Sequence, residues 1–392
     1  MNWGLVISII DWVLFVGVAF TVLYLLFFAI AALFKRKDRF PEPHKQNRIL
    51  VLIPAYKEDT VIENTVRTFL QQSYPRALYD VTVISDHMKE ETNQRLSKLS
   101  ITLLTPDFEQ SSKAKSLDYA INNSGNFKRY DIVVVLDADN TVKHDFLYNI
   151  NKAFEGGSFI IQAHRISKNR NTETALLDAI FEEVNNSIFR LGHICCGLSA
   201  ALVGSGIAYP YQWFREHVGQ TYTSGEDKEF EGMIMSENIF VDYLDDVYVF
   251  DEKVQNTNEF NRQRRRWLAA QYHSFITNFY RFPKAVWTRN YDYADKILQW
   301  GMLPRIIMVG IIGMMSVLLP FWDFGAAIKW WGAALLLIFV FALATPNYLV
   351  DKNFNKILRK IPIVVIGMML NVFRLYGLKK RFLHTEHNVT DI

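Results

Sequence analysis

The chain has 392 residues, half of them hydrophobic, and its formal net charge is +3. This length and composition allow a large core and more than one structural unit. Because the charge is nearly balanced, nothing in it indicates a nucleic-acid partner. The two cysteines, Cys195 and Cys196, are adjacent. A disulfide between neighbours is strained, so we expect reduced, buried thiols in a reducing compartment.

An N-terminal membrane anchor and linker are predicted within residues 1–46. Residues 12–34 contain no charged side chain, and at about 23 positions they are long enough to cross a bilayer as a helix. No small-residue cleavage site follows, which argues against a removable signal peptide. Lys35, Arg36 and Lys37 come next, and positive charge stays cytoplasmic. The pattern predicts a protein of the cell membrane with an external N-terminus and a cytoplasmic domain.

Residues 47–258 alternate short apolar segments with helical patterns. Strands are predicted at 49–54, 81–85, 101–104 and from 132, and helices at 59–72 and 112–122. This alternation is typical of an α/β domain with a mostly parallel, Rossmann-like sheet and helices on both faces. No Gly-x-Gly-x-x-Gly follows the first strand, which disfavours a dinucleotide-binding domain.

Two carboxylates follow the most apolar of these strands. Residues 132–136 read Ile-Val-Val-Val-Leu, which is typical of a strand buried on both faces, and Asp137 and Asp139 come directly after it. Ligands of open α/β sheets bind at the carboxyl ends of strands, and close carboxylates repel unless a cation neutralises them. Hard oxygen ligands suit Mg²⁺ or Mn²⁺. The alternative is an ordinary turn, where Asp is common.

Membrane-associated helices are predicted again after the α/β domain. Residues 259–300 begin with a cationic helical pattern and are expected to form interfacial helices. Within 301–350, the apolar stretches 306–322 and 330–350 are long enough to span a bilayer with some help from their flanks.

The last segment, residues 351–392, is predicted to remain on the cytoplasmic side. Its first ten residues are rich in Lys and Arg. The apolar run 361–373 is shorter than a normal span and is followed by further basic residues, so we expect an interfacial helix. A fourth span is the alternative.

Six short motifs carry candidate chemistry. In chain order they are Ile53-Pro54-Ala55-Tyr56-Lys57-Glu58-Asp59, Ser85-Asp86, Lys113-Ala114-Lys115-Ser116-Leu117-Asp118, Asp137-Ala138-Asp139, Gly225-Glu226-Asp227 and Gln263-Arg264-Arg265-Arg266-Trp267. An aromatic ring and a carboxylate after a strand can hold a base and a ribose, and guanidinium groups pair with phosphate. The alternatives are an acidic helix N-terminus and a basic cluster that binds anionic lipid.

Taken together in this order, the motifs resemble those of membrane-embedded, inverting family 2 glycosyltransferases with a GT-A fold. This group contains the cellulose, chitin and hyaluronan synthases. The resemblance covers about residues 51–267. The sequence departs from the family pattern at Lys57, where Asn is usual, and at 87–89, where His-Met-Lys replaces a small Gly-Ser turn.

The resemblance implies a site for a UDP-sugar donor. It assigns Tyr56 and Glu58 to the nucleotide, Asp86 to the uracil ring and Lys113 to the diphosphate. A lysine at a helix start is unfavourable for the helix dipole, which also suggests that Lys113 faces an anion. The complete predicted donor set is Ala55, Tyr56, Glu58, Asp86, Lys113, Asp137, Gln263, Arg264, Arg266 and Thr385.

The same resemblance implies the metal and catalytic residues. It gives Asp139 to the metal, with Asp137 on the donor or sharing the ion. Inverting transfer needs a base for the acceptor hydroxyl, and the family's base corresponds to Asp227, with Glu226 as the weaker candidate. Acceptor contacts are implied for Gly204, Ser205, Gly206 and Trp267. A plain turn is the alternative for the glycine segment.

A last motif, Phe382-Leu383-His384-Thr385-Glu386-His387, resembles the gating loop of cellulose synthase, with His in place of Val and of Lys. The resemblance places Thr385 near the diphosphate. The alternative is a frayed tail.

The predicted function is a membrane-bound, metal-dependent hexosyltransferase that extends a polysaccharide processively by β-linkages. One alternative is transfer of a single sugar to a lipid or lipid-linked acceptor. An alternative of another class is a non-catalytic membrane scaffold. The sugar, the linkage and the oligomeric state are left open.

Overall fold

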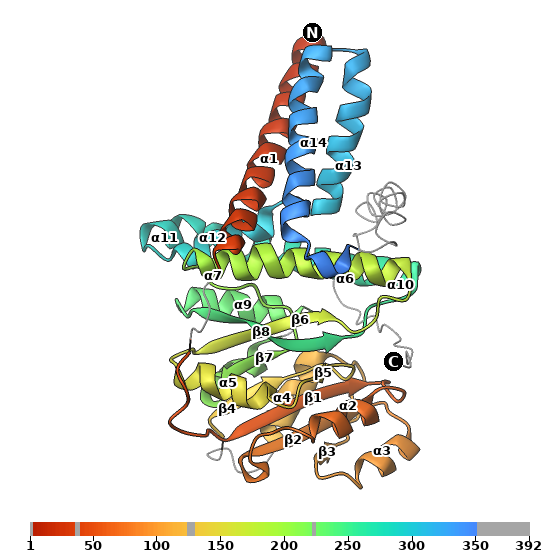
Figure 1. The fold of residues 1–392 in the computed structure, drawn as a ribbon, viewed down its shortest axis with the longest axis vertical. Coiled ribbons are helices and arrows are strands. Elements are labelled where there is room, and N and C mark those ends of the chain that lie inside the picture. Colours follow the sequence, from red (N-terminus) through yellow and green to blue (C-terminus); the bar gives the residue numbers. More distant parts are fainter. Residues whose placement is uncertain (1–2, 36–39, 124–129, 222–224, 351–392) are drawn as a thin grey trace.

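The computed structural model describes residues 3–35, 40–123, 130–221 and 225–350. Figure 1 shows three parts: an α/β domain, a layer of helices that lie across it, and three upright helices above that layer. The upright helices are α1 (Trp3–Ala31), α13 (Arg305–Leu318) and α14 (Phe324–Ala344). The active-site candidates of the sequence analysis fall in the α/β domain and the helical layer.

The α/β domain is built on an eight-stranded sheet of order β3-β2-β1-β4-β7-β6-β8-β5. The strands are β1 (Ile49–Tyr56), β2 (Tyr79–Asp86), β3 (Thr102–Leu104), β4 (Ile132–Val135), β5 (Thr141–Val142), β6 (Ile160–Ser167), β7 (Ile207–Pro210) and β8 (Val241–Asp251). β1 runs parallel to both β2 and β4, β2 is parallel to β3, and β6 is parallel to β8. β7 is antiparallel to β4 and β6, and β5 is antiparallel to β8. The predicted α/β fold with a mostly parallel sheet is confirmed.

Both faces of the sheet are covered, which explains the uninterrupted apolar strands. All four residues of β4 are buried, and β1 is buried from Ile49 to Ile53. α4 (Lys113–Asn123) packs on one face through Leu117 and Ile121, in a cluster with Leu50 and Val133. α2 (Ile62–Phe69) and α5 (Phe146–Glu155) pack on the other face. Alternate residues of a strand point to opposite faces, so both sets must be apolar.

The predicted elements of this domain exist, with shifted ends. β1 continues two residues beyond the predicted end at Pro54, so that Tyr56 is its last residue. The helix predicted at 59–72 is confined to α2, and residues 59–61 form a turn before it. The N–H groups of Ile62 and Thr65 donate to the carbonyls of Glu58 and Val61. The domain also contains α3 (Glu90–Leu96), α6 (Glu173–Asn185), α7 (His193–Cys195), α8 (Tyr211–His217) and α9 (Glu226–Ser236).

The prediction that both cysteines are buried is wrong for Cys196. Both thiols are free, but Cys196 is exposed and Cys195 is half-buried. Cys196 caps the end of the short helix α7, where the chain turns at the surface.

The helical layer separates the sheet from the upright helices (Figure 1). It contains α6, α10 (Thr257–Asn278), α11 (Phe282–Trp287) and α12 (Tyr291–Gly301). α6 begins at the cap Thr172, whose hydroxyl accepts the Ala175 N–H at 3.1 Å. Large aromatic side chains such as Tyr280 and Trp287 are exposed on this layer, as expected for residues at a bilayer surface.

The upright helices pack through an apolar core that includes Val22, Trp330 and Val340. α1 also touches the α/β domain at a π-helical segment, Asn186–Gly192, that continues α6. A Cβ atom added to Gly192 would lie 2.2 Å from the carbonyl oxygen of Phe28, so the two backbones are in direct contact. Only glycine allows this approach.

Two helices are long and apolar enough to cross a membrane, by length and composition: 4–34 and α14. The predicted span at 306–322 corresponds to α13 and the short turn after it, and it passes the same test only together with α12, from which it is bent by 53°. The predicted interfacial helix at 361–373 and the gating-loop motif lie outside the described residues.

A charged pair connects two of the upright helices. Asp11 of α1 forms an ion pair with Lys329 of α14, and its other carboxylate oxygen accepts the indole N–H of Trp330 at 2.7 Å. The Lys329 ammonium also lies 3.8 Å from the centre of the Trp12 ring. Charged groups buried between apolar helices are costly unless paired, so these contacts fix the register of α1 against α14.

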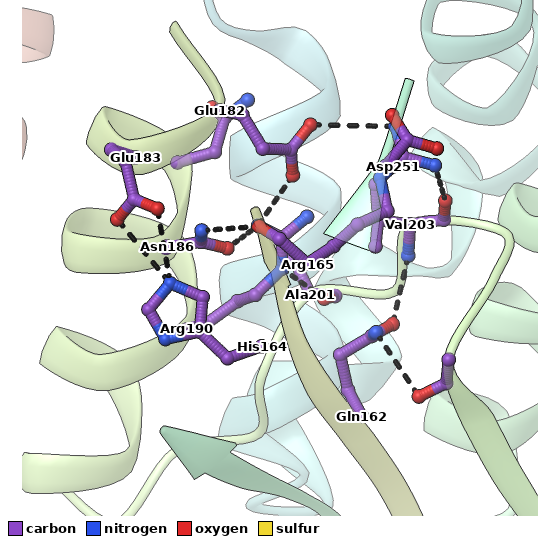
Figure 2. Close-up of polar contacts among 12 residues, drawn as sticks. Gln162, His164, Arg165, Glu182, Glu183, Asn186, Arg190, Ala201, Val203 and Asp251 are labelled. Carbon is purple, nitrogen blue, oxygen red and sulfur yellow. Dashed lines mark hydrogen bonds and ion pairs between the residues drawn. The ribbon is translucent and has the colours of Figure 1, made fainter. Parts of the chain in front are cut away.

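Below this layer a buried histidine, His164, is held by two carboxylates. Figure 2 shows its contacts with one of them, Glu183. His164 of β6 lies with Nε2 at 3.2 Å from Glu183 of α6 and with Nδ1 at 3.2 Å from the carboxylate of Asp245. Burial alone would lower the pKa of His164, but the hydrogen bonds to Asp245 and Glu183 outweigh it and raise the pKa to about 9.

We predict that the free energy of unfolding falls as pH rises above neutrality. A histidine with a raised folded-state pKa contributes its full stabilisation below its ordinary pKa of 6.5 and loses it as pH passes about 9. The shift corresponds to about 3 kcal/mol. Thermal unfolding of the detergent-solubilised chain across this range measures the slope, and His164→Gln should flatten it. An equal slope in both proteins would contradict the assignment.

Candidate active site

The site lies at the carboxyl ends of β1, β2 and β4. Because these strands are parallel and in register, Tyr56 of β1 lies beside Asp86 of β2. β4 ends at Val135, and Asp137 and Asp139 follow in the turn. The sequence therefore brings the predicted nucleotide and metal residues to one edge of the sheet.

Each of the turns after β1 and β2 contains one residue whose backbone has the left-handed conformation. Lys57 has φ 57° and His87 has φ 55°, and the Lys57 N–H donates to the Asp86 carbonyl at 3.3 Å. A non-glycine residue rarely adopts this conformation, and it occurs preferentially at functional sites. It also explains the departure noted in the sequence: His87 occupies a position that suits glycine. Met88 then accepts the Glu58 N–H at 3.1 Å through its sulfur.

Asp86 is buried, with 1% of its surface exposed. One carboxylate oxygen pairs with His87 Nδ1 at 2.5 Å. The other has no hydrogen-bond partner among the described residues, although Asp86 lines the cavity described below. A buried acceptor without a donor is costly, so this oxygen is available to an N–H group of a ligand.

Three carboxylates converge next to it. Oxygens of Asp137, Asp139 and Asp251 lie within 4.8 Å of one another. Asn140 fixes two of them, because its amide donates to both Asp139 and Asp251 at 3.1 Å. The backbone N–H of Glu252 also donates to Asp139, at 3.2 Å. Asp251 ends β8 and was not predicted, although an acidic residue at the end of an apolar strand is the same signal that identified Asp137.

Basic side chains surround this carboxylate triad. Lys113 pairs with Asp137 and donates to the Gly204 carbonyl at 2.6 Å. Arg165 of β6, which is 6% exposed, lies 3.8 Å from Asp137 and 3.6 Å from Asp251. Lys253 pairs with Asp251 at 2.9 Å. Arg165 and Lys253 were not predicted either, because neither belongs to a motif.

The residues fit a hard divalent cation. The triad offers only carboxylate oxygens, which is the donor set of Mg²⁺ and Mn²⁺. The two ligands in the turn come from one Asp-Ala-Asp-Asn segment and the third from β8, so the backbone of the sheet holds the set together. Burial alone would lower the pKa of Lys113, but Asp137 and Glu226 outweigh it and raise that pKa, which keeps the ammonium charged.

The predicted catalytic pair, Glu226 and Asp227, forms the first turn of α9 beside this triad. Glu226 is buried and lies 3.7 Å from Lys113. Burial raises the pKa of Glu226 to about 7, Lys113 opposes this, and Asp227 adds to it. Two adjacent carboxyl groups with different environments can hold different protonation states.

Only the first residue of the predicted acceptor segment 204–206 lines the cavity. A Cβ atom at Gly204 would lie 3.9 Å from an Asp227 carboxylate oxygen, so Gly204 borders the catalytic pair and lines the cavity. Ser205 is fully buried, and its hydroxyl is 3.4 Å from Arg165. Gly206 has φ 65°, and a Cβ there would lie 2.8 Å from Val249. Neither Ser205 nor Gly206 reaches the cavity surface.

The Gln-x-x-Arg-Trp motif lies on α10, in the helical layer. Gln263, Arg264, Arg266 and Trp267 all line the cavity. Gln263 has a buried carbonyl oxygen without a partner among the described residues. The guanidinium of Arg264 lies 4.5 Å from the centre of the Trp267 ring. Arg264 also forms an ion pair with Asp178 of α6. Its charge is therefore already paired within the protein.

A single cavity of about 450 Å³ connects these groups. Of the predicted site residues in the described part of the chain, all line it except Ser205 and Gly206. The predicted residues among those that line it are Ala55, Tyr56, Glu58, Asp86, Lys113, Asp137, Asp139, Gly204, Glu226, Asp227, Gln263, Arg264, Arg266 and Trp267. Thr385 lies outside the described residues. The volume falls in the range of small-molecule sites.

In the wall of the cavity, a buried ionic network extends from β6 to α6 (Figure 2). Glu182 of α6 lies 3.4 Å from Arg165 and 3.1 Å from Arg190. Arg190 also donates to the Ala201 carbonyl at 3.0 Å. Burial alone would raise the pKa of Glu182. The positive charges of Arg165, Lys253, Arg190 and Arg264 outweigh burial and lower that pKa, so Glu182 remains ionised.

A search for related proteins identifies the family. Residues 46–270, more than half of the chain, match the model for "Glycosyltransferase like family 2". A probable glycosyltransferase of Bacillus subtilis strain 168, YdaM, is 27% identical over 106 residues, which is 26% of this chain. The match spans about a quarter of the length of YdaM (25%).

Among solved structures, the chain resembles the mannosyltransferase PcManGT of Pyrobaculum calidifontis, determined with GDP-mannose and Mn²⁺. The TM-score is 0.55 at 16% identity, and the likeness covers 92% of this chain and 99% of that one. At this identity the likeness shows a shared GT-A-like fold. The family match, together with the fold, shows that the chain belongs to glycosyltransferase family 2.

Proposed function

We propose that the protein is a membrane-bound, metal-dependent, inverting glycosyltransferase that moves a hexose from a UDP-sugar to a hydroxyl group at the cytoplasmic membrane surface. One observation carries this proposal: the carboxylate triad, the Glu226–Asp227 pair and Trp267 all line one cavity. A donor held by the triad can therefore meet an acceptor held by the tryptophan, with a carboxylate between them.

The nucleotide end of the cavity supports a uracil base. Tyr56 offers a ring for stacking, and the unpartnered oxygen of Asp86 can accept the N–H of the base. Glu58 lines the same end and can accept from ribose hydroxyls. PcManGT is described with GDP-mannose, and guanine also offers N–H groups. A nucleotide-release screen over UDP-, GDP- and other donors tests the choice of base.

The triad would hold the cation through Asp139, Asp137 and Asp251. When bound, Mg²⁺ or Mn²⁺ would offset the charge on the leaving diphosphate. Lys113 lies on the same side and can hold a phosphate oxygen. Asp227 takes the proton of the acceptor hydroxyl as the oxygen attacks the anomeric carbon, and the product has the opposite anomeric configuration. Glu226, which is buried beside Lys113, is the weaker candidate for this step.

For the product, two candidates remain, and different observations favour them. The Gln-x-x-Arg-Trp motif favours a processive β-glycan synthase. The core of the described helical bundle favours single transfer to a lipid or lipid-linked acceptor, because apolar side chains such as Val22 and Trp330 fill it. A polymer would then need a path built by other residues or by further copies of the chain.

The orientation in the membrane is part of the proposal. The upright helices leave the helical layer on the side away from the sheet (Figure 1). Lys35 follows α1 directly, with Arg36 and Lys37 after it. Positive charge at this end favours a cytoplasmic α/β domain and an external N-terminus.

We predict that Asp227→Asn lowers kcat by about 10²- to 10⁴-fold, because the variant lacks the general base. Binding of the nucleotide should change little, since the donor-side residues are untouched. Nucleotide release and calorimetric titration with UDP measure the two effects. Asp246→Asn, which changes an exposed aspartate 78% accessible on β8, is the control. Full turnover in Asp227→Asn would favour a different base or a non-catalytic protein.

We predict that Asp251→Asn weakens Mn²⁺ binding by about tenfold or more, because it replaces one of three carboxylates by a neutral amide and leaves Arg165 and Lys253 with one fewer counter-charge. Electron paramagnetic resonance of free Mn²⁺ measures the affinity without turnover. Unchanged affinity would remove Asp251 from the metal site.

We predict that product length separates the two acceptor classes. The purified chain, supplied with radiolabelled donor and lipid, should give either a polymer or a lipid that carries a single added sugar. Gel filtration after lipid extraction distinguishes them. Labelled polymer would refute single transfer, and products with one sugar only would refute processive synthesis.

A further inference from the structure

The cavity wall includes residues of the break between α12 and α13, namely Met302, Leu303, Pro304 and Arg305, as well as the residues of the nucleotide end. We call the part of the cavity at this break its second arm. The two helices meet at an angle of 53° at this break. Leu303 is 38% exposed there. The arm therefore opens where the helical layer meets the upright helices, at the level expected for the bilayer surface.

Six large apolar side chains line this part of the cavity, beside polar ones such as Asn185, Arg190 and Gln271: Phe181, Phe189, Trp267, Leu268, Leu303 and Ile306. The apolar side chains come from α6 and the segment after it, from α10, from the break and from the first turn of α13. Such walls suit a hydrocarbon chain better than a water-soluble glycan, because they gain free energy when apolar surface is removed from water.

One cation in the arm lacks an ion-pair partner among the described residues, although Glu182 of α6 interacts with its charge at longer range. Arg305 donates to the side-chain oxygen of Asn185 at 2.5 Å, and its guanidinium lies 5.6 Å from the centre of the Phe189 ring. Its Nη1 atom is buried and has no hydrogen-bond partner in the described part of the chain. No carboxylate of the described residues forms an ion pair with it, whereas Arg264 pairs with Asp178 and Arg190 with Glu182.

A buried guanidinium nitrogen without a partner is costly, so its retention at a cavity wall points to an anionic ligand. Guanidinium groups match phosphate in geometry and charge. The donor diphosphate is the competing ligand. However, the residues proposed to hold it, Lys113 and the triad, lie at the start of α4, after β4 and at the end of β8. Arg305 instead contacts Asn185 of α6 and Phe189 of the segment that follows α6.

We propose that this arm binds the acceptor, and that the acceptor is a lipid whose head group carries a phosphate next to the hydroxyl that receives the sugar. The inference rests on the proposed function and specifies its acceptor. The phosphate contacts Arg305, the hydrocarbon chain leaves through the break at Leu303, and the hydroxyl reaches Asp227.

The reaction is balanced without a further reagent. The acceptor O–H bond breaks and its proton passes to Asp227. The acceptor oxygen forms a bond to the anomeric carbon, and the bond from that carbon to the diphosphate breaks, with its electron pair leaving on the nucleoside diphosphate. The acceptor phosphate takes no part in bond changes, so Arg305 is a positioning residue.

The test uses the full chain in phosphatidylcholine vesicles with three probes. Phosphatidylglycerol supplies the phosphate, the hydroxyls and the tail; diacylglycerol lacks the phosphate; glycerol 3-phosphate lacks the tail. A photoreactive phosphatidylglycerol should label residues at the break, such as Leu303, and only unlabelled phosphatidylglycerol should compete. Equal competition by diacylglycerol would overturn the phosphate site. Labelling confined to the outer surface of the bundle would overturn the arm as a lipid site.

Variants at Arg305 separate its charge from its packing. Arg305→Gln can keep the contact with Asn185. It should reduce labelling and raise the KM of phosphatidylglycerol by about tenfold or more. If phosphatidylglycerol binds without reacting, its inhibition constant should rise by the same factor. Arg305→Lys should recover part of this loss. The donor KM should stay within about twofold.

Arg281→Gln is the matched control. Arg281 is an exposed arginine of the same helical layer that bonds only to Tyr280 and Tyr293 and does not line the cavity. An equal effect in Arg281→Gln would show general attraction to anionic lipid and would overturn the site. If donor turnover persists while Arg305→Gln changes neither labelling nor lipid affinity, this inference fails and the proposed function stands. If no donor is turned over by the unaltered chain, the proposed function itself fails.

Discussion

Repulsion among three carboxylates at one end of the sheet is the constraint on which the site depends. Asp137, Asp139 and Asp251 can approach within 4.8 Å only because positive groups lie around them. Lys113, Arg165 and Lys253 supply three such charges from α4, β6 and the end of β8. Each is buried or nearly so, where charge interactions are strong. The protein can therefore keep the site assembled before any ligand arrives.

Along α6, contacts with arginine side chains continue from the sheet to the upright helices. Asp178, Glu182 and Asn185 follow one another at spacings of four and three residues, which places them on one face of the helix. They contact Arg264 of α10, Arg165 of β6 and Arg305 of α13, in that order. One helix face thus joins the sheet, the Gln-x-x-Arg-Trp helix and the first turn of an upright helix.

The parts of the site that follow from local sequence could be predicted. Tyr56, Asp86 and Asp137 come directly after apolar strands, and parallel strands bring such residues to one edge. Asp251 and Arg165 could not be placed this way, because the antiparallel strand β7 lies between β4 and β6 and the strand order there is not sequential. Apolar periodicity identified the first four strands, but it did not identify β5 to β8, and the strand order depends on packing between distant segments.

The predicted acceptor segment 204–206 also depends on strand packing that the sequence does not reveal. Gly204, Ser205 and Gly206 share the absence of bulk that suggests room for a sugar. Only Gly204 borders the cavity, while Gly206 is needed because a side chain there would collide with Val249. A glycine required by the approach of a neighbouring strand cannot be told from one required by a ligand unless that strand's position is known.

The close packing of α1 against the π-helical segment has a consequence for where the enzyme can work. Because Gly192 lets the carbonyl of Phe28 rest against the main chain, the anchor and the α/β domain are joined without a compliant layer of side chains. In the proposed membrane orientation, the cavity is thereby held at a fixed height above the lipid. Distance from the membrane would then select the substrate together with chemical identity, because a hydroxyl that projects too far from the membrane plane, or too little, would miss the proposed base, Asp227.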